Sequence, residues 1–566
     1  MINILCDLLL VGFIGISVYI LYRTRNYRFG VVVSNDENKT LSDGSGGLEI
    51  SFGSSRANDI CVADRSVQPF ESEVKYAPEQ DGAFVINEVG GAGGNSYGLA
   101  RYSLGKATFS LSLPGAPVFY KSLFGLIAVL IGIVYAILRA ISFRYLESYP
   151  WVVIPFGMVV VYIIAMYFVR ADNAPIIETA FAMLVTHQTE VIFYGANEEQ
   201  LKERTIFAAV SVGLYLLSSI AVRIFLRYCK VYRERAWVFR AVAAVAIAVL
   251  AVVNLLLAKD NNGAYNWVKI GENLSFQPSE LIKVPLIFML AVPAGEEFIR
   301  LKNLFFSVGV PVCCMIYALL IRDSGVMVQY AVITVAALLV QNSSFLLSAL
   351  TAVVAVIVCK FLPSWWSVLL PKLSTTAFSR INGWLGSGSF LDGLSGKGVW
   401  ASTENYGYQS AQTAAAAFES GLFGAADSPY EVLKNVAAAN SDLVIGVLGE
   451  KNGSVFVILT VLLFALIVIF SFSSLKQQDK TTQVLTVTAL SLITSGVLLN
   501  IGGTLGVLPL TGIVLPALSR GGTAAISYGV CFGIISSTGV THAYMNELLN
   551  TGKKRRSRSE TNWDEE

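Results

Sequence analysis

Long apolar runs separated by short polar connections occupy most of this chain. An α-helix needs about 20 apolar residues to cross about 30 Å of hydrocarbon. Runs of this kind, some of them shorter, are Ile4 to Tyr22, Val118 to Leu138, Trp151 to Phe168, Ile206 to Leu226, Ala241 to Ala258, Leu281 to Val292, Leu304 to Ile321, Val326 to Val340, Phe345 to Phe361, Val455 to Phe470, Val484 to Ile501 and Ala524 to Ala543. The pattern predicts an all-α polytopic membrane protein in which residues 1–22 form an N-terminal anchor.

The segment Ile176 to Tyr194 is a weaker candidate because it carries Glu178, His187 and Glu190. Basic clusters mark cytoplasmic flanks, and only an odd number of crossings places all the clusters of this chain inside. We therefore expect about 13 spans, with the N-terminus outside. The clusters are Arg23, Arg25 and Arg28; Arg227, Lys230, Arg233 and Arg235; and Lys553, Lys554, Arg555, Arg556 and Arg558. Arg139 and Arg144, which this topology places outside, argue against it.

Residues 29–113 interrupt the apolar pattern with polar, Gly-rich sequence. Short runs such as Gly30 to Ser34 and Ala83 to Asn87 are typical of strands. We expect a small all-β sandwich here, on the cytoplasmic side, followed by two additional transmembrane helices in residues 118–170.

A second polar stretch, residues 362–454, is too long for an ordinary connection, and loops of this length are usually functional or disordered. It is rich in tryptophan, and Ala411 to Gly424 is expected to form an interfacial helix. The topology makes it a large extracellular loop. Aromatic side chains at the headgroup level suit a lipid-linked substrate.

The composition agrees with a membrane protein. Of the 566 residues, 54% are hydrophobic and 14% are charged, and the mean hydropathy is +0.61. These values exclude a soluble globular enzyme. The formal net charge of +2 is too balanced for a nucleic-acid-binding protein. The seven cysteines have no CxxC or ligand-like spacing, so we expect no disulfide framework and no metal site. Residues 551–566 form a basic, then acidic, cytoplasmic tail.

Within residues 29–113, the sequences Gly53-Ser-Ser-Arg-Ala-Asn-Asp-Ile60 and Gly94-Asn-Ser-Tyr-Gly98 resemble a forkhead-associated (FHA) domain, a phosphothreonine-binding module. The arginine that directly follows the glycine in that family is Ser54 here, although Arg56 is near. A phosphate site needs fixed donors such as arginine. Phosphothreonine binding and docking of an unmodified cytoplasmic protein partner therefore both stay open, and the departure favours docking.

Four blocks follow one another across residues 175–550. They are Trp267-Val-Lys-Ile-Gly271 with Gln277-Pro-Ser-Glu280 and Lys283; Asp323-Ser-Gly325; Arg380 with Gly407-Tyr-Gln409, Gly421-Leu-Phe-Gly424 and Asn440-Ser-Asp442, ending at Gly449-Glu450; and Asn500-Ile-Gly502, Leu508-Pro-Leu-Thr-Gly512 and Leu515-Pro-Ala-Leu-Ser519-Arg520-Gly-Gly522. Together they resemble the SEDS family (shape, elongation, division and sporulation), which includes RodA, FtsW and SpoVE. The match gives this region a SEDS core of about ten helices.

The resemblance implies a peptidoglycan glycosyltransferase. Such an enzyme polymerises lipid II into glycan strands at the outer face of the bacterial cytoplasmic membrane, in elongation, division or sporulation. The attacking sugar hydroxyl loses a proton, and the anomeric carbon releases undecaprenyl pyrophosphate. The site therefore needs a base and cations. The resemblance assigns no cofactor, and binding of a divalent cation at the pyrophosphate stays an open alternative.

Asp442 matches the essential aspartate of the family, so the resemblance makes it the catalytic base. General-base assistance supplies about 10² to 10⁴ in rate. An alternative is that Asp442 only opens a helix, because Asn440, Ser441 and Asp442 are all good capping residues.

Glu280 and Lys283 lie three residues apart, so they can pair across one helical turn. Lys283 could instead approach the pyrophosphate of the substrate, and both readings stay open. Arg380 is the better candidate anion ligand because guanidinium binds phosphate oxygens in a bidentate manner. Its alternative is a solvated loop arginine.

The remaining candidate substrate-binding residues come from the same blocks: Trp267, Gln277, Gln409, Ser519 and Arg520. Some positions depart from the family. Arg520 replaces a usual aromatic residue and could add a phosphate contact, and Lys451-Asn452 replaces the usual Glu-Leu after Glu450.

Two other classes of function stay open. A flippase that transports lipid II would share the multispan architecture, but inverted repeats of the kind that transporters often show are not evident. A catalytically divergent scaffold would explain the altered motifs, but the retained Asp442, Gln409 and Gln277 to Glu280 argue against it. The expected partners are lipid II, a class B penicillin-binding protein and membrane lipids, and no nucleic acid.

Overall fold

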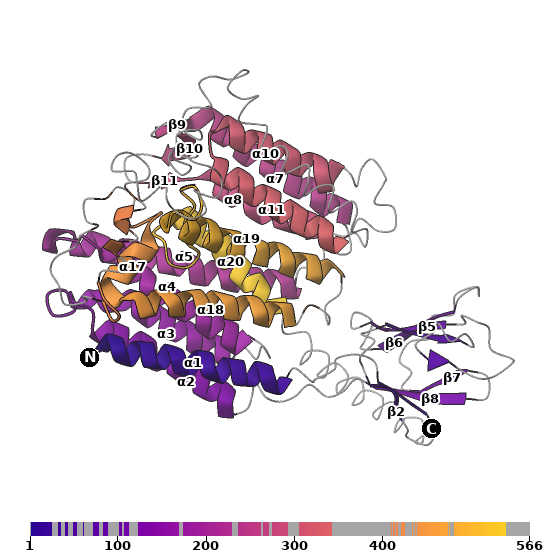
Figure 1. The fold of residues 1–566 in the computed structure, drawn as a ribbon. Coiled ribbons are helices and arrows are strands. Elements are labelled where there is room, and N and C mark those ends of the chain that lie inside the picture. The colour runs from indigo at the N-terminus through magenta and orange to yellow at the C-terminus, as the bar shows by residue number, and fades with distance from the viewer. Residues whose placement is uncertain are drawn as a thin grey trace, which may run out of the picture.

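The computed structural model shows a helical body and, at one end of it, the strands of residues 32–112 (Figure 1). It describes residues 2–24, the strands between 32 and 112, 123–168, 174–228, 236–261, 264–270, 274–291, 305–341, scattered positions from 409 to 436, 439–473, 475 and 480–538. Arg380, the predicted span Phe345 to Phe361 and the tail 551–566 lie outside the described residues.

A helix occupies every predicted apolar segment in the described part of the chain. The helices are α1 (Ile2–Thr24), α2 (Leu123–Ile141), α3 (Val153–Phe168), α4 (Ala174–Phe193), α5 (Leu201–Tyr228), α7 (Ala236–Leu257), α8 (Pro278–Ala291), α10 (Val310–Leu320), α11 (Ser324–Gln341), α17 (Val444–Asn452), α18 (Ser454–Ser473), α19 (Lys480–Thr504) and α20 (Gly522–Thr538), with short turns at η2 (Pro150–Val152), η3 (Glu198–Gln200) and η4 (Phe305–Gly309). The predicted mainly α-helical class is confirmed.

Seven of the described helical segments are long and apolar enough to cross a membrane, whereas the sequence predicted about 13 spans. They are Ile2–Leu21, Pro150–Tyr167, Glu198–Leu226, Trp237–Leu257, Ser324–Gln341, Ser454–Phe472 and Thr481–Thr504. Three shorter apolar helices are Gly125–Ile141, Phe305–Leu320 and Gly522–Ser537. The chain is therefore a multi-pass membrane protein.

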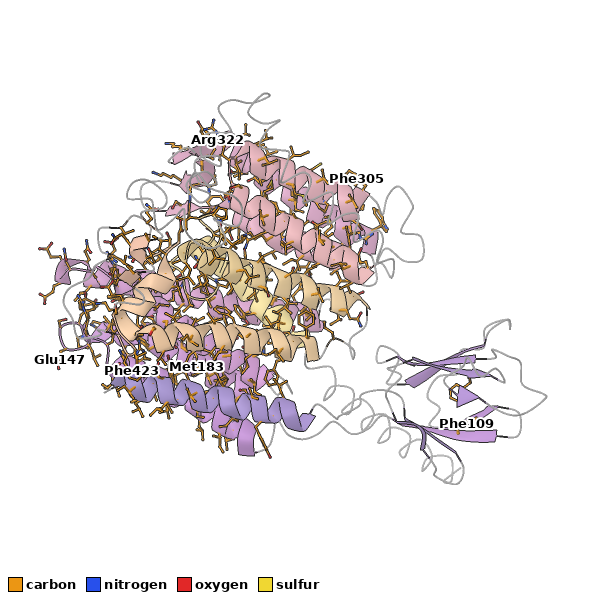
Figure 2. The ribbon with its side chains drawn as sticks, viewed as in Figure 1. Phe109, Glu147, Met183, Phe305, Arg322 and Phe423 are labelled. Atoms are coloured by element: carbon orange, nitrogen blue, oxygen red, sulfur yellow. The ribbon has the colours of Figure 1, made fainter. Side chains whose placement is uncertain are left out.

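Helix α4, at the doubtful segment Ile176 to Tyr194, lies in the centre of the body. Arg204, near the start of α5, donates to the carbonyl oxygen of Ile192 near the end of α4 (2.6 Å). Arg223, near the end of α5, pairs with Glu178 near the start of α4. The two helices are thus antiparallel along most of their length. Protein surrounds α4 almost completely, and its Met183, labelled in Figure 2, is buried.

Two glycines allow α20 to pack closely on α5. A Cβ atom at Gly529 would lie 2.5 Å from the backbone oxygen of Tyr215, and one at Gly533 would lie 2.5 Å from the backbone oxygen of Ser219. Glycines four residues apart let two membrane helices approach each other, because nothing projects from that face.

Residues 32–112 form two four-stranded sheets. Their strands are β1 (Val32–Asn35), β2 (Thr40–Asp43), β3 (Glu49–Gly53), β4 (Ile60–Cys61), β5 (Ser72–Ala77), β6 (Ala83–Glu88), β7 (Arg101–Leu104) and β8 (Ala107–Ser112), ordered β2-β1-β8-β7 and β4-β3-β5-β6. All the pairings are antiparallel except that of β3 with β4. Phe52 of one sheet contacts Phe109 of the other, with ring centroids 5.4 Å apart. This region is therefore made of strands, as predicted.

A small three-stranded sheet links α7 to α8, which the sequence did not predict. Its strands are β9 (Ala258–Asn261), β10 (Ala264–Ile270) and β11 (Leu274–Phe276), in the order β11-β10-β9. Val268 pairs with Phe276 across β10 and β11. This pairing fixes the chain directly before Gln277, and so places the start of α8.

Candidate active site

The connection from α19 to α20, residues 505–521, is an ordered irregular segment at the heart of the site. Asn500 donates from Nδ2 to the carbonyl oxygen of Ile513 (2.7 Å). The backbone nitrogen of Leu508 donates to the carbonyl oxygen of Gly502 (2.9 Å). The backbone nitrogen of Ala517 donates to the Tyr215 hydroxyl of α5 (3.2 Å). These bonds hold the 505–521 segment against two helices.

The same region binds the backbone around Asp442. Ser519 donates from Oγ to the carbonyl oxygen of Ser441 (2.6 Å). The Arg520 backbone nitrogen donates to the carbonyl oxygen of Asn440 (3.0 Å). Asn500 donates from Nδ2 to the carbonyl oxygen of Asp442 (2.7 Å). Three successive carbonyl oxygens are thus fixed from one side, and the half-buried Asp442 is held at the start of the chain that leads into α17.

The helix that follows Asp442 begins one residue later than a cap at Asp442 would place it. The N-cap position of α17 is Leu443, whose side chain makes no capping hydrogen bond. An N-cap side chain accepts a hydrogen bond from the second or third helical residue. Asp442 lies one residue before the N-cap position, and its catalytic role stays a prediction.

Ser519 and Arg520 lie beside Asp442 but differ in exposure. The Ser519 hydroxyl is buried, accepts a hydrogen bond from the Leu515 backbone nitrogen (2.7 Å) and donates to Ser441, so its observed contacts orient the backbone. The Arg520 side chain is exposed, with its guanidinium 4.4 Å from the ring centroid of Phe207. Partial burial, and next the nearby Arg204, lower the pKa of Arg520. Arginine is nevertheless cationic at neutral pH, so Arg520 places a positive charge over Phe207 of α5.

Gln277 lies in a second polar group, at the start of α8. Its Nε2 donates to Asp323 Oδ2 (2.9 Å), which also accepts from Asn266 Nδ2 (3.0 Å). Asp323 Oδ1 accepts from the Val326 backbone nitrogen (3.1 Å) and thereby caps α11. The Gln277 backbone nitrogen donates to Thr523 Oγ1 (3.1 Å), which joins this group to the start of α20.

Glu280 and Lys283 form a buried ion pair, one turn further along α8. Lys283 Nζ lies 2.5 Å from Glu280 Oε1 and 2.6 Å from Gln329 Oε1. It also lies 5.7 Å from the ring centroid of Tyr528. The Lys283 side chain is 0% exposed. Among the described residues, Glu280 Oε2 is buried and has no hydrogen-bond partner. The predicted pairing is therefore present, while a substrate contact of Lys283 stays a prediction.

The two remaining described candidates lie at the edges of the site. Trp267 is half-buried in β10, opposite Lys259 of β9. Gln409 is half-buried, and its carbonyl oxygen accepts from Thr413 Oγ1 (2.6 Å). A Cβ atom at Gly446 of α17 would lie 2.9 Å from the Thr413 backbone oxygen, so the Gln409 segment packs on the helix that follows Asp442. Substrate binding by both residues stays a prediction.

Known proteins are similar to this chain over much of its length. A family model described as cell cycle protein, that of FtsW, RodA and SpoVE, matches residues 176–543. The chain belongs to this family. The match begins inside α4, so α1, α2 and α3 form an N-terminal extension outside it, together with the eight strands.

Several curated relatives are named probable peptidoglycan glycosyltransferase FtsW. The protein of Wigglesworthia glossinidia brevipalpis is 26% identical over 292 residues, which cover 50% of this chain and 72% of the relative. The Bacillus subtilis protein is 23% identical, and the match covers 62% of this chain and 83% of the relative. The Borreliella burgdorferi protein is 28% identical, and the match covers 51% of this chain and 76% of the relative. These relatives agree with a multi-pass protein of the bacterial cytoplasmic membrane.

Solved structures also match this FtsW/RodA/SpoVE protein. A chain from a peptidoglycan synthase complex gives a TM-score of 0.47 at 20% identity and covers 65% of this chain and 97% of that chain. The rod shape determining protein RodA of Thermus thermophilus gives a TM-score of 0.41 at 19% identity and covers 64% and 95%.

The family member carries a buried polar group that the sequence did not reveal, at the ends of α2, α4 and α17. Arg139 is 6% exposed and pairs with Glu190 (2.5 Å). His187 Nδ1 lies 3.0 Å from Glu190 Oε2, and the Tyr135 hydroxyl lies 2.5 Å from His187 Nε2. The signal was available, since an ionisable residue inside an apolar segment usually has a partner. Arg139 is therefore a buried ion-pair partner of Glu190. A charge paired inside the protein does not mark a cytoplasmic flank, so Arg139 does not argue against the predicted topology.

Proposed function

We propose that this chain is a peptidoglycan glycosyltransferase that polymerises lipid II, with Asp442 as the general base. One observation carries the assignment of the residue: the three successive carbonyl oxygens of Asn440, Ser441 and Asp442 are held from the 505–521 segment and α19. A base must be placed within hydrogen-bonding reach of the proton it removes. A backbone fixed in this way supplies that placement.

The cations of the site have separate tasks in this proposal. Arg520, whose backbone nitrogen donates to the carbonyl oxygen of Asn440, is proposed to supply positive charge to the leaving pyrophosphate. Charge fixed in advance stabilises such a transition state without reorganisation. Arg380, outside the described residues, is proposed as the bidentate pyrophosphate ligand, and Lys283 as a further one. Among the described residues, no three His, Cys, Asp or Glu side chains are grouped to hold a metal ion. A divalent cation at the pyrophosphate stays a prediction.

Two further proposals concern partners. A class B penicillin-binding protein is proposed as the partner at the membrane, because the SEDS resemblance implies one. The two sheets of residues 32–112 are proposed to be an FHA-like domain that docks a cytoplasmic protein, with Ser54 in place of the phosphate-binding arginine. The contact of Phe52 with Phe109 between the sheets supports a sandwich.

The deciding experiment uses full-length purified protein with fluorescent or radiolabelled lipid II. Polymer in detergent solution supports the glycosyltransferase. Movement of lipid II across vesicles without polymer would identify the flippase, and neither activity would identify a scaffold. A reaction with Asp442→Asn, run beside the wild type, separates polymer made by this chain from that made by a contaminant.

A further inference from the structure

The N-terminal extension contacts α17 at the end of that helix that lies farthest from Asp442. Resting on the proposed function, we propose that Asn3, Arg139 and Asn452 are positioning residues. They tie the extension to the far end of α17, the helix that follows Asp442, and so hold the base in place for the reaction.

Asn3, in the first turn of α1, makes the first contact. Its Nδ2 donates to the carbonyl oxygen of Lys451 in the last turn of α17 (3.2 Å) and to that of Phe423 (3.0 Å). Phe423 lies near the N-terminal end of α1 in Figure 2. The last carbonyl oxygens of a helix have no partner within it, so Asn3 satisfies one of these acceptors of α17.

Arg139, near the end of α2, makes the second contact. Its Nη2 donates to Asn452 Oδ1 (2.5 Å), and its Nη1 donates to Asn3 Oδ1 (3.1 Å). Asn452 in turn donates from Nδ2 to Glu190 Oε2 (3.2 Å). The cation therefore lies at the C-terminal end of α17, where a positive charge stabilises the negative end of the helix dipole.

Helix α17 transmits a displacement of this end to Asp442. It has nine residues and so is about 13 Å long. Most of its side chains are buried, and the Tyr194 hydroxyl donates to Glu450 Oε2 beside the same end (2.6 Å). A rigid element of this length moves as one body, and a displacement of about 1 Å at a reacting group can cost about 10² in rate.

Arg139 of the extension bonds a residue, Asn452, that departs from the family motif. By the SEDS resemblance Lys451-Asn452 replaces Glu-Leu, and leucine could not accept a hydrogen bond from Arg139. Arg139 lies outside residues 176–543, the part that matches the family. Asn452, which departs from the family pattern, thus accepts a hydrogen bond from Arg139, which lies outside the family region.

The test uses full-length Asn3→Ala and Asn452→Leu, which cut the contacts to α17 but keep the Arg139 and Glu190 pair. Arg139 itself is kept, because its removal would leave Glu190 unpaired in a buried place. Initial rates are measured against lipid II concentration. We expect kcat to fall on the order of tenfold, with KM within about twofold of the wild type, because ground-state binding is untouched. Hydrogen exchange of the α17 amides should become faster.

Two matched controls separate positioning from general destabilisation. Leu8→Ala changes a side chain of α1 that is 62% exposed. Tyr162→Phe removes a hydroxyl that donates to Glu178, in the other buried ion pair of α4. Both should keep the kcat and the α17 exchange of the wild type.

The outcomes decide between the hypotheses. Wild-type kcat in both Asn3→Ala and Asn452→Leu overturns the proposal, and so does an equal loss of kcat in Tyr162→Phe. If the wild-type chain makes no polymer, the proposed function fails. Hydrogen exchange then tests by itself whether the extension holds α17 in place. Faster exchange of the α17 amides in the variants supports this contact, and unchanged exchange overturns it.

Discussion

Asp442 has its backbone fixed by residues from elsewhere in the chain, while its side chain is half-buried. The Asn500 side chain donates to the Asp442 carbonyl oxygen and to the Ile513 carbonyl oxygen (2.7 Å each), so one residue joins the chain at Asp442 to the 505–521 segment. At this scale the position of the proposed base is set by contacts to its backbone.

The first prediction concerns Asp442→Asn. The amide has the size of the carboxylate but cannot accept the proton, so polymerisation should fall by at least about 10² while folding and membrane insertion are kept. The measurement is the yield of glycan polymer from labelled lipid II, with thermal unfolding in detergent as the control for folding. A yield equal to that of the wild type would remove Asp442 from the mechanism.

The second prediction concerns Lys283 and Glu280. Lys283→Met leaves the Glu280 carboxylate buried without its cation, which costs about 3 to 5 kcal/mol in comparable buried pairs. We expect lower expression and lower polymerisation. The double change Glu280→Gln with Lys283→Met removes both charges and should restore expression.

Activity of that double variant decides the role of Lys283. If Lys283 contacts the pyrophosphate, polymerisation stays low although expression recovers. Full recovery of polymerisation would show that the pair is structural only.

At the scale of elements, α4 shows how a helix of this body can be less apolar than a membrane span requires. Its Glu178, His187 and Glu190 reduce the apolar character that a membrane span requires. Each of them has a partner on a neighbouring element: Tyr162 and Arg223 for Glu178, Tyr135 for His187, and Arg139 for Glu190. A helix enclosed by protein does not have to be apolar on every face, because its polar groups are satisfied internally.

The third prediction tests the contact of α5 with α20. Gly529→Ala places a methyl group against the Tyr215 backbone oxygen, which cannot rotate away. Overpacking of this kind costs about 1 to 3 kcal/mol, so the unfolding temperature in detergent should fall. Gly157→Ala in α3 is the matched control, because a methyl group at that position would have no described atom within 4 Å. Equal unfolding temperatures for the two variants would show that the helices can separate without loss.

At the scale of the whole molecule, the ends of α1 lie on opposite sides of the helical body. Asn3 contacts Phe423 and Lys451 at the far end of the helix that follows Asp442, whereas the strands of residues 32–112 follow the other end of α1 (Figure 1). A span separates the strands from the site. If Asp442 acts outside the membrane, the strands are in the cytoplasm.

The fourth prediction is that Cys61, in β4, is cytoplasmic. In a variant that keeps Cys61 as the only cysteine, an impermeant thiol reagent should label the protein only after the cells are permeabilised. A denatured sample shows whether the thiol can react at all. Labelling in intact cells would reverse the topology.

The sequence by itself determined the class of the molecule and the family. Apolar runs must form helices in a membrane because each helix satisfies its own backbone hydrogen bonds. The alternating runs of residues 29–113 likewise indicated strands. The blocks around Gln277, Asp442 and Ser519 indicated the family before any contact was known, because motif order is a property of the chain alone.

Only the tertiary structure decided how the site is held together. Ser519 and Ser441 are 78 positions apart, and Arg139 and Asn452 are 313 positions apart, so no local pattern joins them. The structure also showed Ser519 as a buried residue that orients the backbone, α4 as the enclosed centre, and Leu443 in the N-cap position. Hydrophobic periodicity reports which face of an element is apolar. The partner of a buried polar atom depends instead on which elements meet, and that is settled when the helices pack.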